Sequence, residues 1–234
     1  MINPKRPQVI NVDLENNMVV TSYMDHKATN NRGASEIRRV GVFVELKEKD
    51  KDGKFILPID PKSYTKDKYD KQEYYQAKMG KCSHFAESLN SSLDSFLGIY
   101  FSDKDPAKFG ERYKVLNKLD YMNARNLLSE VLKSDNKFMQ IEEINTAEKL
   151  KHFTKTFFYF ITDRNKYTHG LLYLSYPDFT PTIQYENDEK KIEYAMIDDQ
   201  IISDYFETHE YLSVILNKLY ELELADFNKK NTAS

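Results

Sequence analysis

The chain has 234 residues, of which 40% are hydrophobic and 13% aromatic, so it is long enough to bury one full hydrophobic core. Its 34 Lys and Arg residues nearly balance 37 Asp and Glu residues. The resulting formal charge of -3 excludes a protein that binds nucleic acid through a basic field over its whole surface. Any contact with RNA is therefore expected to be a local patch.

We expect no segment of this sequence to direct the chain to a membrane or out of the cell. The N-terminus lacks an apolar signal core, and the longest uncharged apolar run, residues 156–162, is too short to cross a bilayer. The single cysteine, Cys82, cannot form an intramolecular disulfide and falls at an apolar position of a helical pattern, which is typical of a reducing compartment. We expect a soluble, cytoplasmic protein without membrane contact.

Residues 1–65 differ from the rest of the chain, because prolines and turn-rich runs interrupt their short apolar groups. Within this part, residues 40–46 and 54–59 flank Asp52 and Gly53. Two apolar runs around such a turn are typical of a β-hairpin with a longer loop. The sequence therefore predicts an N-terminal arm that contains one β-hairpin.

Residues 66–227 are predicted to form a helical domain. Apolar residues recur every three or four positions from about Lys71 to Ser102, which indicates a long amphipathic helix. Pro106 suits the first turn of the next helix, which continues to about Lys133 with a break near Asp120.

A further helix is expected to end at a polar segment. Asn145, with Glu148 three positions later, suits the N-cap of this helix in a capping-box arrangement. Gly170 is the residue type preferred where a helix ends in a left-handed turn. His169 would then lie in the last turn.

Three β-like runs between residues 171 and 197 predict a hairpin or small sheet. Asp198 or Asp199 is expected to cap a final helix, and the tail 228–234 is expected to be disordered. The predicted fold class is therefore mainly α, a helical bundle with accessory β-hairpins in the N-terminal arm and after the polar segment.

The polar segment 163–170 has the strongest chemical content. At about 100° per residue, Asn165 and His169 differ by about 40° around the helix axis, whereas Arg164 and His169 differ by about 140°. The negative end of the helix dipole favours a protonated imidazole. An imidazole for proton transfer, a guanidinium for negative charge and an amide for positioning together suit a phosphodiester substrate.

This segment resembles the signature of the HEPN superfamily (higher eukaryotes and prokaryotes nucleotide-binding). That signature has an Arg, a polar residue and then a His four to six positions after the Arg, at the end of a bundle helix. The matching residues are Arg164, Asn165 and His169, and Gly170 fits the ending common in such proteins. The resemblance covers roughly residues 70–225 in helix order, although about eight residues carry its specificity.

The resemblance implies a dimeric helical bundle that is commonly a metal-independent endoribonuclease, often a toxin of a toxin–antitoxin pair or an anti-phage effector. We accordingly expect RNA as substrate, no cofactor, a homodimer, and an antitoxin or other protein partner. A two-fold axis beside the motif would supply both a base and an acid from His169. The alternative function is a non-catalytic HEPN-like module that binds a nucleotide or a protein.

A purely structural interpretation of the segment is also open. Arg164 would then be a surface cation paired with Asp163 or Glu148, and His169 would contact the last carbonyls of its helix. The other helical histidines are expected to be structural or exposed to solvent: His84, His152 and His209.

Overall fold

The structure of the chain is a computed structural model that describes residues 2–13, 17–29, 35–58, 65–103 and 105–232. These residues divide into two compact units. Unit 1 comprises residues 1–5, 82–164 and 203–234, and unit 2 comprises residues 6–81 and 165–202. Three long helices contribute to both units: α1 (Lys66–Tyr100), α4 (Ala147–His169) and α5 (Asp199–Thr232).

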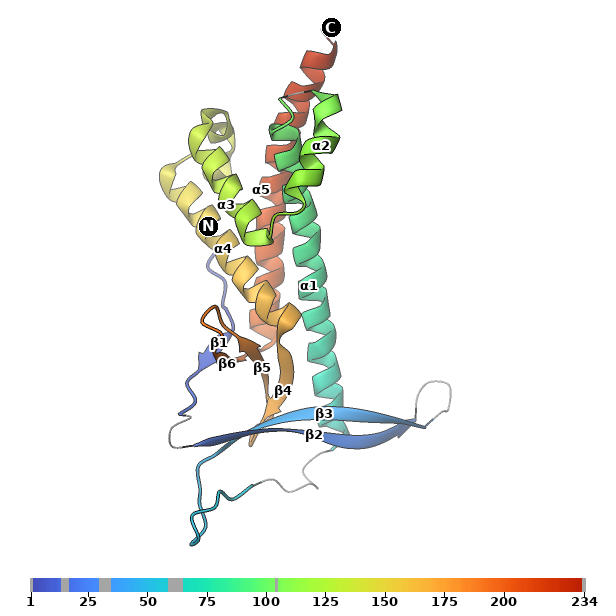
Figure 1. The fold of residues 1–234 in the computed structure, drawn as a ribbon, viewed down its shortest axis with the longest axis vertical. Coiled ribbons are helices and arrows are strands. Elements are labelled where there is room, and N and C mark those ends of the chain that lie inside the picture. Colours follow the sequence, from blue (N-terminus) through green and yellow to red (C-terminus); the bar gives the residue numbers. More distant parts are fainter. Residues whose placement is uncertain (1, 14–16, 30–34, 59–64, 104, 233–234) are drawn as a thin grey trace. The chain divides into compact units, whose positions relative to one another are not determined.

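The described residues of unit 1 are mainly helical (Figure 1). Besides the long helices, it contains α2 (Pro106–Leu116), α3 (Tyr121–Ser134) and the short 3-10 helices η2 (Asn136–Gln140) and η3 (Glu142–Ile144). Apolar side chains three or four positions apart are buried on three helices: Leu89, Leu93 and Phe96 of α1, Phe153, Phe157 and Phe160 of α4, and Leu212, Ile215 and Leu219 of α5. The predicted periodicity of these helices is thereby confirmed.

Two aspartates set the starts of α2 and α3. The Asp105 side chain accepts a hydrogen bond from the backbone N–H of Ala107, and Pro106 occupies the first turn. Asp120 accepts one from the N–H of Asn123 at 2.8 Å. Each carboxylate satisfies a backbone donor that the helix itself leaves unpaired. The predicted break near Asp120 is therefore confirmed.

The N-cap of α4 differs from the predicted one. The Thr146 hydroxyl accepts a hydrogen bond from the backbone N–H of Lys149 at 3.2 Å, whereas Asn145 ends the preceding helix η3. The prediction of Asn145 was wrong because this 3-10 turn occupies the position immediately before the helix. Thr146 can cap the helix by the same chemistry.

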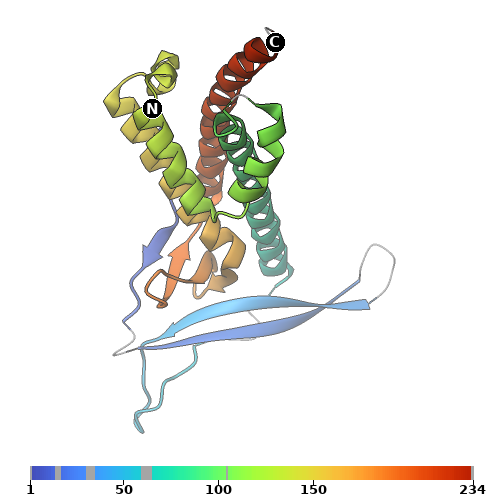
Figure 2. The same ribbon diagram turned by 45° about the horizontal axis from the view of Figure 1, so that its top comes forward.

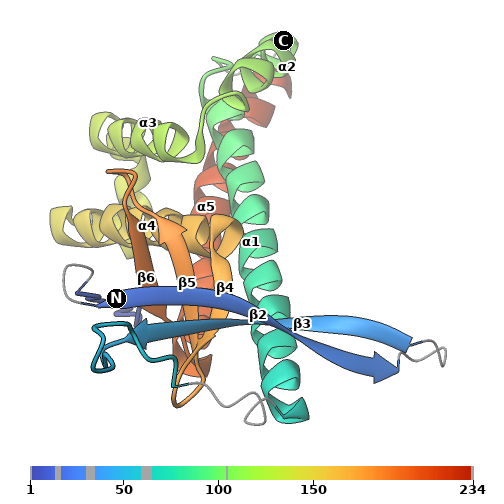
Figure 3. The ribbon, with the colours of Figure 1, turned by 60° about the horizontal axis from the view of Figure 1, so that its bottom comes forward.

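Unit 2 contains a six-stranded sheet in the order β1-β6-β5-β4-β3-β2. Its strands are β1 (Gln8–Ile10), β2 (Met18–Thr29), β3 (Ser35–Leu46), β4 (Leu171–Ser175), β5 (Thr180–Glu186) and β6 (Ile192–Met196). Only β3 and β4 pair in parallel, and every other pair of neighbours is antiparallel. Figure 3 shows that β2 and β3 form a long ribbon, which is also visible in Figure 2.

The predicted mainly α fold was wrong, because the structure has mixed α/β content. The strands expected as separate accessory hairpins join one sheet through the pairs Val42–Leu174 and Phe43–Ser175. These partners are more than 130 positions apart in the chain, and strand alternation indicates a strand without indicating its partner.

The predicted hairpin between residues 40–46 and 54–59 was also wrong. Strand β3 pairs with β2 along its whole length, and residues 49 and 55 form only an isolated bridge beside Gly53. Residue 59 lies outside the described residues. The longer ladder with β2 satisfies far more backbone hydrogen bonds than the short loop could.

The final helix begins as predicted, since Asp198 accepts a hydrogen bond from the backbone N–H of Ile201 at 2.7 Å. Helix α5 continues to Thr232, through residues 228–232 where a disordered tail was predicted. Residues 233 and 234 lie outside the described residues. No helix in the described ranges combines the length and apolarity that a membrane span requires.

Gly170 joins α4 to β4 by close packing. The structure gives it no positive φ, so the predicted left-handed turn was wrong. A Cβ at this position would collide with Cγ2 of Ile183 and the carbonyl oxygen of Lys166. Glycine is required here because β5 and the last helical turn leave no room for a side chain.

We expect Gly170→Ala to lower the free energy of unfolding by about 1–3 kcal/mol, the usual cost of forcing a methyl group into a filled space. Gly80→Ala is the matched control, because its added methyl meets nothing within 4 Å. Helix propensity should make that control more stable by up to about 1 kcal/mol. Urea unfolding of both variants measures the difference, and equal effects would contradict the steric explanation.

Candidate functional site

Arg164, Asn165 and His169 lie in the last two turns of α4. Asn165 and His169 are both exposed and are four positions apart on the helix, so the amide and the imidazole share one side of it. The predicted shared side of these two residues is therefore present, and both residues are accessible to solvent.

Arg164 has an ionic partner that the sequence did not suggest. Its guanidinium forms an ion pair with Glu87 of α1, and its side chain is only 20% exposed. This partner is 77 positions away in the chain, whereas the structural interpretation named Asp163 or Glu148. The structure thus brings Asn165 and His169 together and places the Arg164 guanidinium against α1.

Lys166 is a buried cation within the same segment, and the sequence analysis gave it no role. Its ammonium group lies 5.3 Å from the centre of the Tyr185 ring of β5. Tyr185 in turn donates a hydrogen bond to Glu193, and this bond is the largest cause that lowers the pKa of Glu193. Lys166 therefore attaches the end of α4 to the sheet of unit 2. Its position between Asn165 and His169 was the only feature of the sequence that could have indicated its importance.

A buried polar cluster lies around Arg164 in unit 1. The pKa of Tyr121 is raised well above its usual value, first by burial and then by the negative charges of Glu87 and Asp94, while Arg164 lowers it. The hydroxyl of Tyr121 and Oδ1 of Asp94 are buried and have no hydrogen-bond partner among the described residues. The ion pair of Arg164 therefore borders a poorly satisfied polar interior.

Asp94 is the residue of this cluster that sequence reasoning missed. It is 5% exposed, and burial raises its pKa to about 6. The only signal in the sequence was an Asp within the apolar stripe of α1, beside Leu93. Its Oδ2 accepts a long hydrogen bond of 3.5 Å from the amide nitrogen of Asn90.

The remaining helical histidines pack against aromatic rings or face solvent. His209 stacks on Phe85 with ring centres 4.8 Å apart, and burial lowers its pKa. Burial also lowers the pKa of His152, whose ring lies edge-on to Tyr211. His84 is exposed. Within the described ranges, no group of three or more His, Cys, Asp or Glu residues is placed to hold a metal ion.

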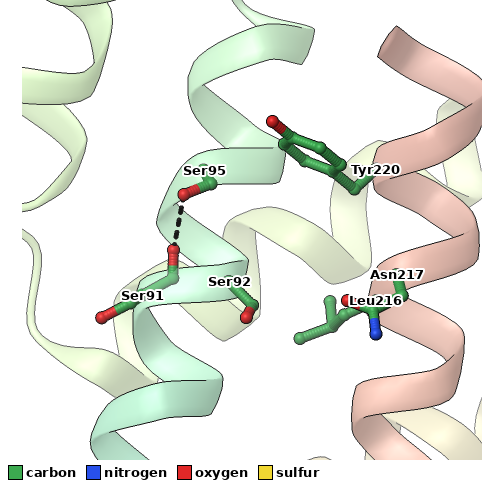
Figure 4. Close-up of a pocket in the computed structure, with 6 residues that line it drawn as sticks. All are labelled: Ser91, Ser92, Ser95, Leu216, Asn217 and Tyr220. Carbon is green, nitrogen blue, oxygen red and sulfur yellow. Dashed lines mark hydrogen bonds between the residues drawn. The ribbon is translucent and has the colours of Figure 1, made fainter. Parts of the chain in front are cut away.

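A pocket of about 240 Å³ lies between α1 and α5 (Figure 4). Its lining residues are Ser91, Ser92, Ser95, Leu216, Asn217 and Tyr220. Each serine hydroxyl donates a hydrogen bond to the carbonyl four residues earlier, for example Ser95 to Ser91 at 2.8 Å. The hydroxyls are therefore occupied by their own helix, and no residue of the Arg164–His169 segment lines this pocket.

Protein-family models, curated proteins and solved structures gave no match to this chain. The resemblance to the HEPN superfamily consequently depends on residues 163–170 and on their place at the end of α4.

The raised pKa of Asp94 predicts a measurable dependence of the protein's stability on pH. The pKa of Asp94 is about 6 in the folded state and near the ordinary value of 3.8 in the unfolded state. From about pH 4 to pH 6 the folded state therefore retains a proton that the unfolded state has lost. Stability should therefore fall as the pH rises through this range. Asp94→Asn cannot ionise, and its free energy of unfolding relative to wild type should rise by about 2–3 kcal/mol between pH 4 and pH 7.5.

Urea unfolding at several pH values measures this difference. Glu111→Gln removes an exposed carboxylate of α2 and serves as the control. If the difference in free energy of unfolding between Asp94→Asn and wild type stays constant with pH, burial does not raise the pKa of this carboxyl.

Proposed function

We propose that this chain is a metal-independent endoribonuclease of HEPN type, which acts in the cytoplasm as a toxin or anti-phage effector. Its site would combine Arg164, Asn165 and His169 from two copies of the chain. The main support is the exposure of Asn165 and His169 on one side of α4, where a phosphodiester can reach both. An antitoxin or other protein partner belongs to this proposal.

The chemistry requires one base and one acid. The imidazole of one His169 takes the proton of the RNA 2′-hydroxyl, whose oxygen attacks phosphorus. The bond from phosphorus to the 5′-oxygen breaks, and His169 of the second copy protonates that oxygen. The products are a 2′,3′-cyclic phosphate and a 5′-hydroxyl. Asn165 orients the imidazole or the phosphate by hydrogen bonding.

Arg164 would stabilise the negative charge on the phosphate oxygens. To do so, its guanidinium must exchange Glu87 for the substrate. The Glu87 side chain is 57% exposed, and an ion pair of this kind contributes only about 0–1 kcal/mol. A doubly hydrogen-bonded phosphate is the stronger partner, so the observed pair is compatible with substrate binding.

We expect His169→Ala to lower the rate of RNA cleavage by on the order of 10²- to 10⁴-fold, because a general acid–base group is lost. Arg164→Lys should also be impaired, since an ammonium group cannot present a planar fork to two oxygens. The measurement is cleavage of labelled single-stranded RNA in chelator. His84→Ala, which removes an exposed histidine of α1, is the control and should retain activity. Equal activity of all proteins at matched thermal stability would reject the site.

We further expect the chain to be a symmetric dimer, because one motif supplies only one imidazole. Light scattering at micromolar concentration should give twice the chain mass of 27.6 kDa. Full cleavage activity from a species with the mass of one chain would contradict the composite site.

The second candidate function is a non-catalytic HEPN-like module that binds a nucleotide or a protein. The ion pair between Arg164 and Glu87 favours it, because this pair gives the arginine a structural role without any substrate. Growth inhibition on expression distinguishes the two candidates. Inhibition that disappears in His169→Ala supports the nuclease, since a binding module has no reason to be toxic through that imidazole alone.

A further inference from the structure

Helices α3 and α4 lie side by side in unit 1 (Figure 2). An exposed aromatic residue of α4 and a half-buried arginine of α3 are in contact there. Phe158 of α4 is 41% exposed, and the Arg125 guanidinium of α3 lies 5.8 Å from its ring centre. The centre of the Tyr159 ring lies 5.7 Å from that of Phe158, and the Lys155 ammonium group lies 5.5 Å from the centre of the Tyr159 ring. We call these four residues the α3–α4 patch: Arg125, Lys155, Phe158 and Tyr159.

Arg125 has no counter-ion among the described residues. Its guanidinium donates hydrogen bonds to the carbonyl oxygen of Thr154 and to Oδ1 of Asn126, while its Nε is buried without a partner. Burial lowers its pKa, and no carboxylate in the described ranges offsets this effect. Charges that lose water are normally paired in proteins, so a half-buried unpaired cation is a place where an anion would bind with little competition.

The neighbouring lysines also lack an ion pair among the described residues. Lys155 and Lys151, one helical turn apart, are both exposed, and neither forms an ion pair within the described part of the chain. Lys133, farther along α3, is by contrast paired with Glu130 at 2.8 Å. The formal charge of the chain is -3, so these unpaired cations do not follow from an excess of positive charge over the whole chain. They are a local feature of this surface.

We propose that the α3–α4 patch binds single-stranded RNA, with Phe158 stacking on an unpaired base and Arg125 and Lys155 contacting the flanking phosphates. Aromatic faces beside cations are the usual means of holding single strands without sequence preference, and a duplex cannot offer a free base to such a ring. The inference rests on the proposed function and extends it, because it names a surface outside residues 163–170 that would hold the RNA.

The position of Phe158 along α4 suits this role. Asn165 and His169 follow it by seven and eleven residues in one uninterrupted helix. Both spacings return to within about 20° of the same side of the helix axis.

The test measures binding of a fluorescein-labelled single-stranded RNA 12-mer in chelator by anisotropy, with full-length His169→Ala protein so that cleavage does not interfere. Phe158→Ala in this background should bind on the order of 10-fold more weakly or worse, and Phe158→Trp should retain affinity. Arg125→Gln and Lys155→Gln should each weaken binding and lower the slope of log affinity against log salt by about 0.7.

Two control variants match these changes. Val214→Ala removes an exposed apolar side chain of α5, and Lys133→Gln removes the paired cation of α3. Both should bind like the parent. Failure of the parent to bind at low salt, or unchanged binding by both Phe158→Ala and Lys155→Gln, would overturn the inference. Equal affinity for duplex and single-stranded RNA would overturn it as well.

The outcome also separates this inference from the proposed nuclease. Binding that depends on Phe158, without cleavage by the wild-type protein, keeps the patch and rejects the nuclease. Cleavage that depends on His169, with binding indifferent to the patch variants, keeps the nuclease and rejects the patch.

Discussion

The burial of one aromatic side of α4 is the constraint on which the candidate site depends. Phe153, Phe157 and Phe160 are almost completely buried, and Phe160 stacks on Tyr205 of α5 with ring centres 4.3 Å apart. Rotating the helix would expose these rings, at about 1.5–3 kcal/mol for each buried side chain. The rotation of this part of α4 is thereby fixed, and Arg164 turns to Glu87 of α1. Asn165 and His169, in the last turns of the helix, are exposed.

Charge burial divides the polar groups of unit 1 into two kinds. The pair of Arg164 with Glu87 is partly exposed, so water screens it and a substrate can compete for it. Asp94 and Arg125 instead lose water without gaining an opposite charge from the described residues. Burial raises the pKa of Asp94 and lowers that of Arg125, so in both cases it favours the neutral form. Groups of this second kind cost stability, and such a cost is commonly found where a protein prepares a functional surface.

Local physics explains which features the sequence could predict. A helix repeats every 3.6 residues and an Asx cap reaches only two or three residues, so the long helices, the break at Asp120 and the cap at Asp198 follow from neighbours in the chain. The placement of Arg164, Asn165 and His169 at a helix end is equally local. The stop at Gly170 was foreseen for the wrong reason, because contact with Ile183 rather than a left-handed turn requires the glycine.

The sequence by itself thus determined the helices, the strands after Gly170 and the residues at the end of α4. Only the tertiary structure decided that the strands join one sheet through Val42 and Leu174, which makes the protein mixed α/β rather than mainly α. It alone paired Arg164 with Glu87, 77 positions away, and placed Arg125 beside Phe158, with no carboxylate partner in the part of the chain that the structure describes. The physical reason is that periodicity and capping act over a few residues, whereas strand partners and counter-ions are chosen by whatever the folded chain brings alongside.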